Sequence, residues 1–468
     1  MRPQQRQQVV VAGAGVAGAT AALALGDQGH DVVVVERDEG RPPERSADVD
    51  AWRRRGVPHF HQPHAFQARM FAELDAGLPD VARRLDEAGA VPVPLGPTAR
   101  SAWLRRSLLE RVLHGALADH PAIRTVSAGV RGLDAAGGRV RAVRLTDGGS
   151  LPADLVVDAT GRRGRLGVDV GGSPEVWDEP CDEVYTSRRY RLHPGAEPGT
   201  VNRAVVSVSE GDGYTLLVFP HDHGYFTITF TRLPEDDGLA RLREEPLFER
   251  AVAAVPLAAQ WADPARSAPV SEVLVMAGLR NRFSRGTTGV PLGVHAVGDS
   301  VCTTNPHFGR GSSLAVASAL RLATAVADSP GDPQSWRAQH DAWRDGELRG
   351  WFDDTCTLDR ERSAVWRAAL HHAPVPASPA GTVTRSDVLA AAGRDPVIGR
   401  AVGQHMNLLS APESIEALVP RVLRLRTAPP VGAPAGPPTG HRPPVVPPAP
   451  PRDALLEAVL ASPLAVTG

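Results

Sequence analysis

The hydrophobic pattern near the start of the chain predicts a strand, a helix and a second strand in close succession. Residues 8–12 contain three consecutive valines, which is typical of a short buried strand, and an alanine- and leucine-rich stretch to about Gly29 predicts a helix. Residues 31–36 form a second valine-rich strand that ends in Glu36. A β-α-β unit of this kind indicates an α/β protein with a parallel sheet.

The turn between the first strand and the helix carries glycines at Gly13, Gly15 and Gly18, with the spacing GxGxxG. The first glycine permits a tight turn, the second lets a pyrophosphate approach the backbone, and the third lets the helix pack against the strand. The helix N-terminus then offers free N–H groups to the phosphates. Glu36 follows Gly18 by 18 residues, near the spacing of an acid that binds a ribose hydroxyl. Together these features predict a dinucleotide site.

Further along the chain, helical and extended patterns alternate. Apolar positions at helical spacing predict helices over residues 64–90, broken near Pro79, and over residues 103–120. Alternating apolar and polar positions separated by glycine turns predict a β-meander over residues 123–157 and a mostly antiparallel sheet over residues 182–232. Later segments are predicted as helices over 244–260, 333–370 and 453–461, and as a proline-rich linker over 429–451.

A second dinucleotide signal lies far from the first. Residues 294–297 predict a buried strand, which ends in Gly298-Asp299 and leads into a glycine-rich loop and another helix. An aspartate at such a strand end can accept hydrogen bonds from a ribityl chain, and the turn over residues 309–313 opens a helix whose N–H groups can face an anionic ring. A nicotinamide cofactor needs only the first motif, whereas a flavin uses both.

With Glu36-Arg37, the strand end Asp158-Ala159-Thr160-Gly161-Arg162 and Gly298-Asp299, the chain resembles the class A type of FAD-dependent monooxygenases over about residues 7–330. These enzymes have the para-hydroxybenzoate hydroxylase fold, and their relatives include squalene-type and polyether epoxidases, geranylgeranyl reductases and flavin halogenases. The resemblance implies an α/β fold in which a Rossmann-like FAD-binding domain carries an inserted antiparallel β-sheet substrate domain and C-terminal helices.

The expected segments are the first part of the FAD-binding domain (1–172), the β-sheet substrate domain (173–267), the second part of the FAD-binding domain (268–330), a C-terminal helical region (331–428), and a proline-rich linker with a terminal helix (429–468). The resemblance places the substrate pocket between the inserted sheet and the flavin.

The resemblance also implies a set of cofactor-binding residues. Gly13, Gly15, Val16, Ala17 and Gly18 would contact the FAD pyrophosphate, Glu36 the ribose, and Arg37 and Val130 the adenine. Arg106 would reach the phosphates or the ribityl chain, and Asp299 would hold the ribityl and pyrophosphate. Pro306, Gly309, Gly311 and Ser312 would lie along the isoalloxazine ring. Candidate catalytic residues are Pro306, Arg310 and His64, with no metal ligand among them.

The activity implied is hydroxylation or epoxidation of a hydrophobic, natural-product-type substrate through a flavin C4a-hydroperoxide. A flavin-dependent reductase or dehydrogenase of an isoprenoid-like alkene is the alternative on the same fold, and a non-catalytic flavin-binding scaffold is a third hypothesis. The family often has Asp-Gly where this chain has Asp158-Ala159, and the chain has no second GxGxxG. These two departures favour a separate flavin reductase, which would be a partner protein. Direct reduction by NAD(P)H is the other expected source of reducing equivalents. The oligomeric state stays open.

Composition narrows the function classes. The chain has 468 residues, 51 basic and 53 acidic, for a net charge of -2, so no basic surplus points to nucleic acid or an anionic membrane. All 51 basic residues are arginines, which excludes chemistry that needs a lysine, including that of a lysine-assisted flavin halogenase. The 3 cysteines are far apart, which disfavours a disulfide framework or a cysteine zinc site and favours the cytoplasm. No apolar run of about 18 residues predicts a transmembrane segment.

Several polar residues allow two interpretations. His59, His61 and His64 do not have a zinc-site spacing, and either lie in a loop near flavin or substrate or serve as structural histidines. His221 and His223 flank a predicted hairpin turn, where solvated turn histidines are favoured.

Arg310 either contacts an acidic substrate or the reduced flavin, or is a surface arginine. Trp336, Trp343 and Trp351 predict core packing on one helix face, and Cys302 a small buried side chain.

Overall fold

The computed structural model describes residues 6–164, 166–375, 381–427 and 447–461, and its centre is a parallel five-stranded sheet. The strand order is β18-β9-β1-β2-β5, and all four neighbouring pairs are parallel. The strands are β1 (Gln8–Ala12), β2 (Asp31–Glu36), β5 (Ile123–Ser127), β9 (Leu155–Asp158) and β18 (Val294–Ala296). This confirms the predicted α/β fold with a Rossmann-like core.

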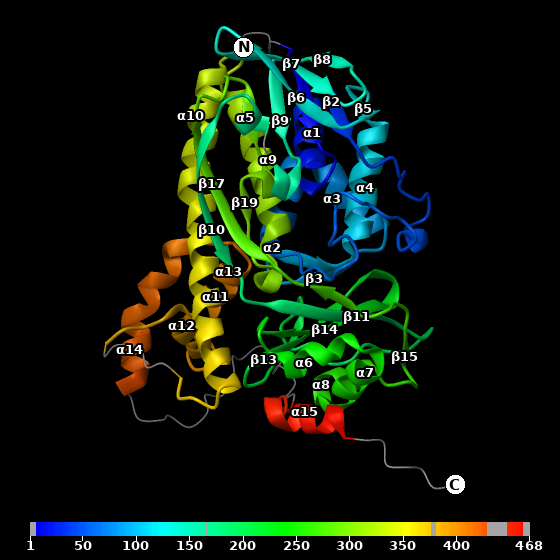
Figure 1. Cartoon of the computed structure of the whole chain (residues 1–468), viewed down its shortest axis with the longest axis vertical. Helices are drawn as coiled ribbons and strands as arrows, with labels where there is room; N and C mark the ends of the chain where they lie inside the picture. The colour runs from blue at the N-terminus through cyan, green and yellow to red at the C-terminus, as the bar shows by residue number, and fades with distance from the viewer. Residues whose placement is uncertain (1–5, 165, 376–380, 428–446, 462–468) are drawn as a thin grey trace.

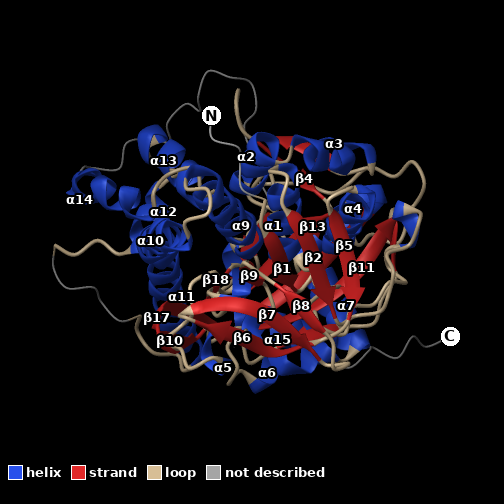
Figure 2. Ribbon diagram, turned by 90° about the horizontal axis from the view of Figure 1, so that it is seen from above, coloured by secondary structure: helices blue, strands red, loops and turns tan. Residues whose placement is uncertain are grey.

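Both faces of the parallel sheet are covered, which explains its unbroken valine runs. On one face, Val9, Val11 and Val34 join a core with helices, and on the other face Val10 and Val35 join a core with an antiparallel meander. The helices include α1 (Val16–Asp27), α2 (Ala68–Gly77), α3 (Pro79–Glu87), α4 (Arg106–Asp119) and α9 (Gly311–Asp328). The meander consists of β6 (Val130–Ala136), β7 (Arg139–Leu145) and β8 (Ser150–Pro152). Figure 2 shows the helices and the meander on opposite sides of the sheet.

The meander predicted over residues 123–157 is wrong at both of its ends. Only β6, β7 and β8 pair antiparallel, whereas β5 pairs parallel with β2 and β9 pairs parallel with β1. The reason is the preceding helix: α4 packs against α1, so the chain returns to the sheet in the same direction as β2. Short extended runs alone do not reveal whether a strand's partner is parallel or antiparallel.

A second sheet is antiparallel, with the strand order β12-β13-β14-β11-β15 and with β16 paired to β11. Its strands are β11 (Val184–Leu192), β12 (Ser207–Glu210), β13 (Tyr214–Pro220), β14 (Tyr225–Arg232), β15 (Ser267–Pro269) and β16 (Leu274–Met276). One face packs on α6 (Asp237–Ala240), α7 (Glu245–Ala254) and α8 (Pro256–Trp261). The helix predicted over residues 244–260 is thus two helices, because Pro256 has no N–H to continue α7 and begins α8 instead.

Long strands and the C-terminal helices connect the two sheets. β10 (Ser173–Pro180) pairs antiparallel with β17 (Arg280–Thr288), which also pairs with β19 (Cys302–Thr303), and Figure 1 shows them running between the two sheets beside α11. α10 (Pro333–Trp343) continues through a π-turn into α11 (Arg349–Leu370), as the predicted helix over 333–370 requires. The remaining elements are β3 (Val91–Pro94), β4 (Arg100–Trp103), α5 (Leu166–Asp169), α12 (Arg385–Ala391), α13 (Pro396–Met406) and α14 (Val419–Thr427).

The tryptophans of α10 and α11 pack as predicted, since Trp336 and Trp351 are fully buried and Trp343 is half-buried. Cys302 is also buried, and burial raises the pKa of its thiol. No helix in the described ranges is long and apolar enough to span a membrane.

The C-terminal helix α15 (Arg452–Leu460) completes the core of the antiparallel sheet. Leu455 and Val459 are fully buried beside α7, and Arg452 forms an ion pair with Asp236 at 2.7 Å. Most of the predicted proline-rich linker, residues 429–446, lies outside the described residues. The terminal helix is therefore part of the sheet's hydrophobic core, and deleting residues 429–468 would expose that core.

Leu455→Ala is expected to lower the free energy of unfolding by about 2–5 kcal/mol, because it leaves a cavity at a fully buried position. Urea titration followed by circular dichroism measures the change. Leu460→Ala is the matched control on the same helix, because Leu460 is 43% exposed. Equal stability of the two variants would show that α15 is not part of the core in solution.

Candidate flavin site

The predicted glycine motifs come together at the carboxyl ends of β1, β9 and β18. A Cβ atom on Gly13 would lie 2.5 Å from the backbone oxygen of Ala159, and one on Gly298 would lie 2.7 Å from the Cβ of Ala17. The strand end at Asp158 and the turn at Gly298 therefore both contact the first glycine turn. The carboxyl edge of a parallel sheet, where the chain direction of the connections reverses, is the usual place for a dinucleotide.

Each glycine of the first turn has a different physical role. Gly13 has a φ of +102°, which favours glycine, and a Cβ on Gly18 would overlap the backbone oxygen of Gly13. Gly15 has an ordinary φ of -72°, yet a Cβ there would meet no atom within 4 Å. The backbone at Gly15 thus faces open space at the N-terminus of α1, which fits a phosphate held by backbone N–H groups.

Gly15→Ala is expected to leave the fold intact but to weaken FAD binding by about tenfold or more, because the added methyl enters the space of the pyrophosphate. Thermal unfolding of the apoprotein and quenching of FAD fluorescence measure the two effects separately. Gly18→Ala is the contrasting variant, and it should lower the melting temperature because its Cβ collides with backbone. A Gly15→Ala protein with unchanged FAD affinity would contradict this placement.

Glu36 lies at this turn as predicted, and an arginine that the sequence did not single out holds it there. Glu36 accepts a hydrogen bond from the Ala14 N–H at 2.8 Å and forms an ion pair with Arg54. Arg54 also donates to the Ala14 carbonyl and pairs with Glu110, whose other oxygen accepts from Arg106 at 2.6 Å. Glu110 is fully buried, and although burial alone raises its pKa, Arg106 and Arg54 lower it overall. The predicted Arg106 is thereby fixed beside the glycine turn.

Arg37 and Val130 are placed differently from these buried groups. Arg37 is exposed and Val130 is half-buried at the start of β6, so each has a surface open to a ligand. Their expected positions beside the adenine stay a prediction.

Asp299 lies near both Arg162 and Arg106, whose charges act on its carboxyl group. Burial raises the pKa of Asp299, an effect that Arg162 opposes from 3.9 Å between Nε and Oδ2. His64 Nε2 lies 3.3 Å from the Arg106 guanidinium, and the rings of His59 and His64 are 5.7 Å apart. The histidine-rich loop, residues 59–64, therefore borders the predicted phosphate and ribityl region.

The histidines of this loop are poor proton acceptors. Burial first, and then the Arg106 charge, lowers the pKa of His64 to about 3, and burial together with Arg189 lowers the pKa of His61 to about 4. The His64 Nε2 lone pair faces a guanidinium that can donate to it. This environment disfavours proton transfer by His64, and its expected place among the catalytic residues stays a prediction. In the described part of the chain, no group of three or more His, Cys, Asp or Glu side chains is arranged to hold a metal.

The loop expected to face the isoalloxazine is held from both sides. Asn305 begins a 3₁₀ turn over Pro306–Phe308, Gly309 follows with a φ of +64°, and Gln67 donates to the Phe308 carbonyl at 2.9 Å. The buried hydroxyls of Thr304 and Ser313, at either end of this loop, have no hydrogen-bond partner among the described residues. Unpaired buried hydroxyls at this position fit a polar ligand such as the flavin ring.

The structure corrects the interpretation of Arg310. Its side chain is fully buried and turned toward α11, where it bonds to Asp354 at 2.6 Å and to Thr355 at 2.7 Å. It is therefore not a surface arginine, and its charge is already matched without a substrate or flavin. His405 adds a 3.1 Å contact to the same aspartate. Arg310 fastens the loop to the C-terminal helices.

A second buried polar cluster lies behind the same loop. Glu183 Oε1 accepts from His307 Nδ1 at 2.8 Å, and Glu183 Oε2 accepts from Asn305 Nδ2 at 2.8 Å and lies 2.9 Å from the Tyr185 hydroxyl oxygen. Arg362 completes the cluster with an ion pair to Glu183 at 3.0 Å. Burial alone would raise the pKa of Glu183, but Arg362 and His307 lower it well below its usual range. The loop is thus tied to β11 and α11 through one carboxylate.

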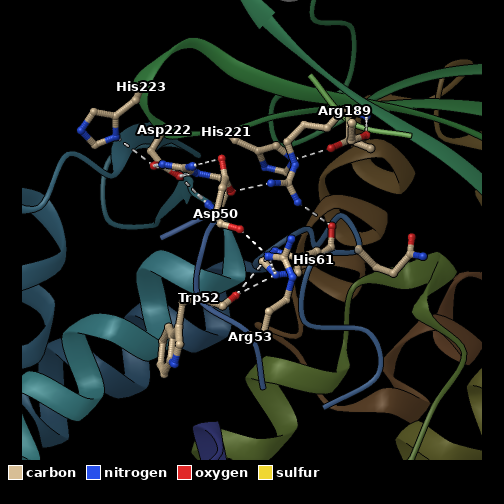
Figure 3. Close-up of polar contacts among 12 residues, drawn as sticks. Asp50, Trp52, Arg53, His61, Arg189, His221, Asp222 and His223 are labelled. Atoms are coloured by element: carbon tan, nitrogen blue, oxygen red, sulfur yellow. Dashed lines mark hydrogen bonds and ion pairs between the residues drawn. The ribbon is translucent and has the colours of Figure 1, made fainter. Parts of the chain in front are cut away.

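The antiparallel sheet meets the first domain through a network of charges, drawn in Figure 3. Asp50 forms ion pairs with Arg105 at 2.8 Å and with Arg189 of β11, while Arg189 also donates to the His61 carbonyl at 2.7 Å. On the sheet side, Asp222 pairs with Arg105 at 2.6 Å. The antiparallel sheet is therefore bonded directly to the histidine-rich loop.

The same network corrects the interpretation of one of the two hairpin histidines, His221. His221 is 5% exposed and bonds to Thr227 at 3.0 Å, and burial with the nearby Arg189 lowers its pKa to about 3. His223 has a φ of +55° and bonds to Asp222 at 2.9 Å. His223 is exposed, as expected of a solvated turn histidine, whereas His221 is buried in the hairpin between β13 and β14, where the neighbouring Asp222 is paired with Arg105.

Sequence reasoning missed Arg54, Glu110, Glu183 and His307. Arg54 belongs to a run of three arginines, a pattern that ordinarily indicates a solvated surface. Glu183 and His307 are 124 residues apart, so only the fold brings them together. The His within the Pro306–Gly309 loop was the one available signal.

The comparisons with known proteins agree with this geometry. A family model described as FAD binding domain matches residues 6–330. No curated protein matches the chain. Among solved structures, the flavin-dependent brominase Bmp2 is 16% identical with a TM-score of 0.61, covering 90% of this chain and 100% of that chain. PqsL from Pseudomonas aeruginosa, a probable FAD-dependent monooxygenase, is 16% identical with a TM-score of 0.51, covering 78% and 96%. The myxobacterial chondrochloren halogenase CndH is 16% identical with a TM-score of 0.58, covering 90% and 96%.

Identities this low show a common fold alone, whereas the family model spans more than half of the chain and ends close to α9. The open backbone at Gly15, the carboxylates at Glu36 and Asp299, and the unpaired hydroxyls of Thr304 and Ser313 fit FAD. The chain belongs to the FAD-binding domain family and is an FAD-dependent enzyme of that family.

Proposed function

We propose that this protein is an FAD-dependent monooxygenase that hydroxylates or epoxidises a small hydrophobic substrate. The observation that carries the proposal is the direct link between the predicted flavin-facing loop and the antiparallel sheet, where the Tyr185 hydroxyl donates to Asn305 at 2.6 Å. This contact supports a position of the sheet beside the isoalloxazine. Oxygen transfer from a flavin needs a site that excludes water, and a sheet fixed over the loop supports that.

The residues of this chain would position and shield rather than react. Gly15 and the N-terminus of α1 would bind the pyrophosphate, and Glu36 would orient the ribose. Asp299 would hold the ribityl chain, and the Pro306–Gly309 loop would lie against the ring. Bound FAD would supply the redox chemistry and the activation of oxygen. The Asp50–Arg189 ion pair would keep water from entering between the sheet and the histidine-rich loop.

Halogenation is the second reaction that neighbouring structures suggest, because Bmp2 and CndH are named as a brominase and a halogenase. The chain contains no lysine, so a lysine-assisted halogenation is excluded for it. Electrons would come from NAD(P)H directly or through a separate flavin reductase. A cytoplasmic location fits the three free, buried cysteines.

The test is the reaction of the reduced protein with oxygen. The FAD-loaded protein is photoreduced without oxygen and mixed in a stopped-flow instrument with oxygenated buffer, with free FAD as the control. We expect a transient absorbance distinct from both reduced and oxidised flavin, in the protein alone or with a filled pocket. Direct reoxidation without a transient across a panel of alkenes and phenols would favour the reductase alternative.

A further inference from the structure

The loop that is expected to face the flavin carries a histidine held by a carboxylate, and nothing in the proposed function uses it. His307 Nδ1 lies 2.8 Å from Glu183 Oε1. Glu183 also accepts from Asn305 Nδ2 at 2.8 Å and pairs with Arg362 at 3.0 Å, and these contacts fit an ionised carboxylate, which can only accept. The proton of the neutral imidazole is therefore on Nδ1, and Nε2 carries a lone pair.

The free nitrogen of His307 is available to a ligand. Within the described residues, Nε2 makes no hydrogen bond, and 17% of the His307 side chain is exposed. The charged and titratable groups around it are Glu183 and Tyr185 at β11 and Asp359 and Arg362 on α11, and Arg362 is paired with both carboxylates. His61 and His64 differ from His307, because Nε2 of each lies against an arginine guanidinium. A histidine that faces a carboxylate gains stability when it takes a proton.

We propose that His307 is a catalytic base and that Glu183 is its positioning residue. The substrate would carry a weakly acidic O–H group conjugated to the carbon that is oxygenated. In this step the substrate O–H bond breaks, an N–H bond forms at Nε2, and the electron pair stays on the substrate oxygen. The resulting imidazolium is stabilised by the Glu183 carboxylate. The proposal rests on the proposed function and adds a substrate class to it.

The loop geometry supports a position beside the substrate. The His307 ring packs against the Phe308 ring, with 4.9 Å between the ring centroids. The loop is bonded to the antiparallel sheet through Asn305. Arg310, Asn305 and Gln67 fix the backbone on either side, so the imidazole is held by a rigid segment. Rigid placement of a base is what proton transfer in a closed site requires.

Two readouts that do not need turnover test the proposal on the FAD-loaded protein. The first is ¹⁵N NMR of histidine-labelled protein at neutral pH, with the His307 signals assigned from their loss in His307→Gln. We expect Nδ1 protonated and Nε2 unprotonated, and a shift toward the other tautomer in Glu183→Gln. An Nε2-protonated neutral ring in the unmodified protein would overturn the proposal.

The second readout uses 3-nitrophenol as the probe and 3-nitroanisole, which has no acidic proton, as its control. Difference absorbance is expected to show bound nitrophenolate at a pH about one unit below that needed in solution, a tenfold shift in ionisation. His307→Gln should lose this shift. The matched control His193→Gln, at an exposed histidine just after β11, should keep it.

Binding of the phenol without ionisation, or no binding up to its solubility limit, would overturn the base and its substrate class. The oxygen reaction is measured separately on the same samples. A normal oxygen transient with no effect of His307→Gln on phenol ionisation would refute this inference and leave the proposed function standing. An ionisation shift in a protein that gives no oxygen transient would refute the proposed function and leave the assignment of His307 as a base standing.

Discussion

Acidification from pH 7 to about 4.5 is expected to unfold this protein, because several buried histidines cannot take up a proton in the folded state. The pKa of His64 and of His221 is lowered to about 3, and that of His61 and of His340 to about 4, in each case mainly by burial. The unfolded chain binds these protons at a pKa of about 6.5. The free energy of unfolding therefore falls as the pH drops from 6.5 toward 4, and is constant above 6.5 as far as these groups are concerned.

The expected size is large compared with the stability of a typical protein. Each histidine contributes about 1.4 kcal/mol per pH unit in this window, so four give about 5 kcal/mol per pH unit, against a total stability of about 5–15 kcal/mol. Burial raises the pKa of Asp158 and of Asp299, and these carboxylates offset part of the slope by taking up protons in the folded state. At still lower pH, Asp354 acts in the destabilising direction, because its pKa of about 2 is below the ordinary value of 3.8.

Urea unfolding followed by tryptophan fluorescence at a series of pH values measures this slope. His221→Gln should reduce the slope by about one proton, and His193→Gln, at an exposed position, should not change it. A free energy of unfolding that stays flat between pH 7 and 5 would contradict the burial of these histidines.

Arg54→Ala is the second change with a large expected effect. It removes the cation shared by Glu36 and Glu110, and Glu110 would keep only Arg106 while fully buried. Breaking a buried ion pair costs about 3–5 kcal/mol. The same change leaves Glu36 at the glycine turn with only its backbone N–H bonds, so FAD affinity should fall as well.

Chemical denaturation of the apoprotein and FAD titration measure the two effects of Arg54→Ala. Arg55→Ala is the matched control, because Arg55 is the exposed neighbour, and it should change stability by no more than about 0.5 kcal/mol. Arg54→Lys keeps the charge but loses the forked geometry, so it should fall between the two. Equal stability of Arg54→Ala and Arg55→Ala would show that the cluster does not form in solution.

The parts of this molecule that could be predicted from sequence are those fixed by local physics. The first turn could be predicted from its three glycines, because a strand, a helix and an acidic residue lie close to them in the sequence. The second turn could be predicted in the same way from Gly298-Asp299. The pairing of β5 with β2 could not be predicted, because it depends on how α4 packs. The burial of His221 could not be predicted for a similar reason. A turn is solvated unless another element covers it, and here Asp222, next to His221, is paired with Arg105.

Arg310 shows the limit for charged residues. Its position in a glycine-rich loop suggested a role toward flavin or substrate, but Asp354 lies 44 residues away on α11 and determines where the guanidinium points. The same holds for Glu183 and His307. Charged partners distant in sequence leave no local pattern, so the cofactor motif was predictable and the polar clusters that hold its loop were not.

The central claim is that the glycine turns at the carboxyl edge of the parallel sheet form one FAD site. Titration of the apoprotein with FAD, followed by flavin fluorescence and visible circular dichroism, tests it most directly. We expect one FAD per chain, an induced dichroic signal from a fixed ring, and weaker FAD binding in Gly15→Ala. A folded chain that takes up no FAD, or binds it without any induced signal, would contradict the account.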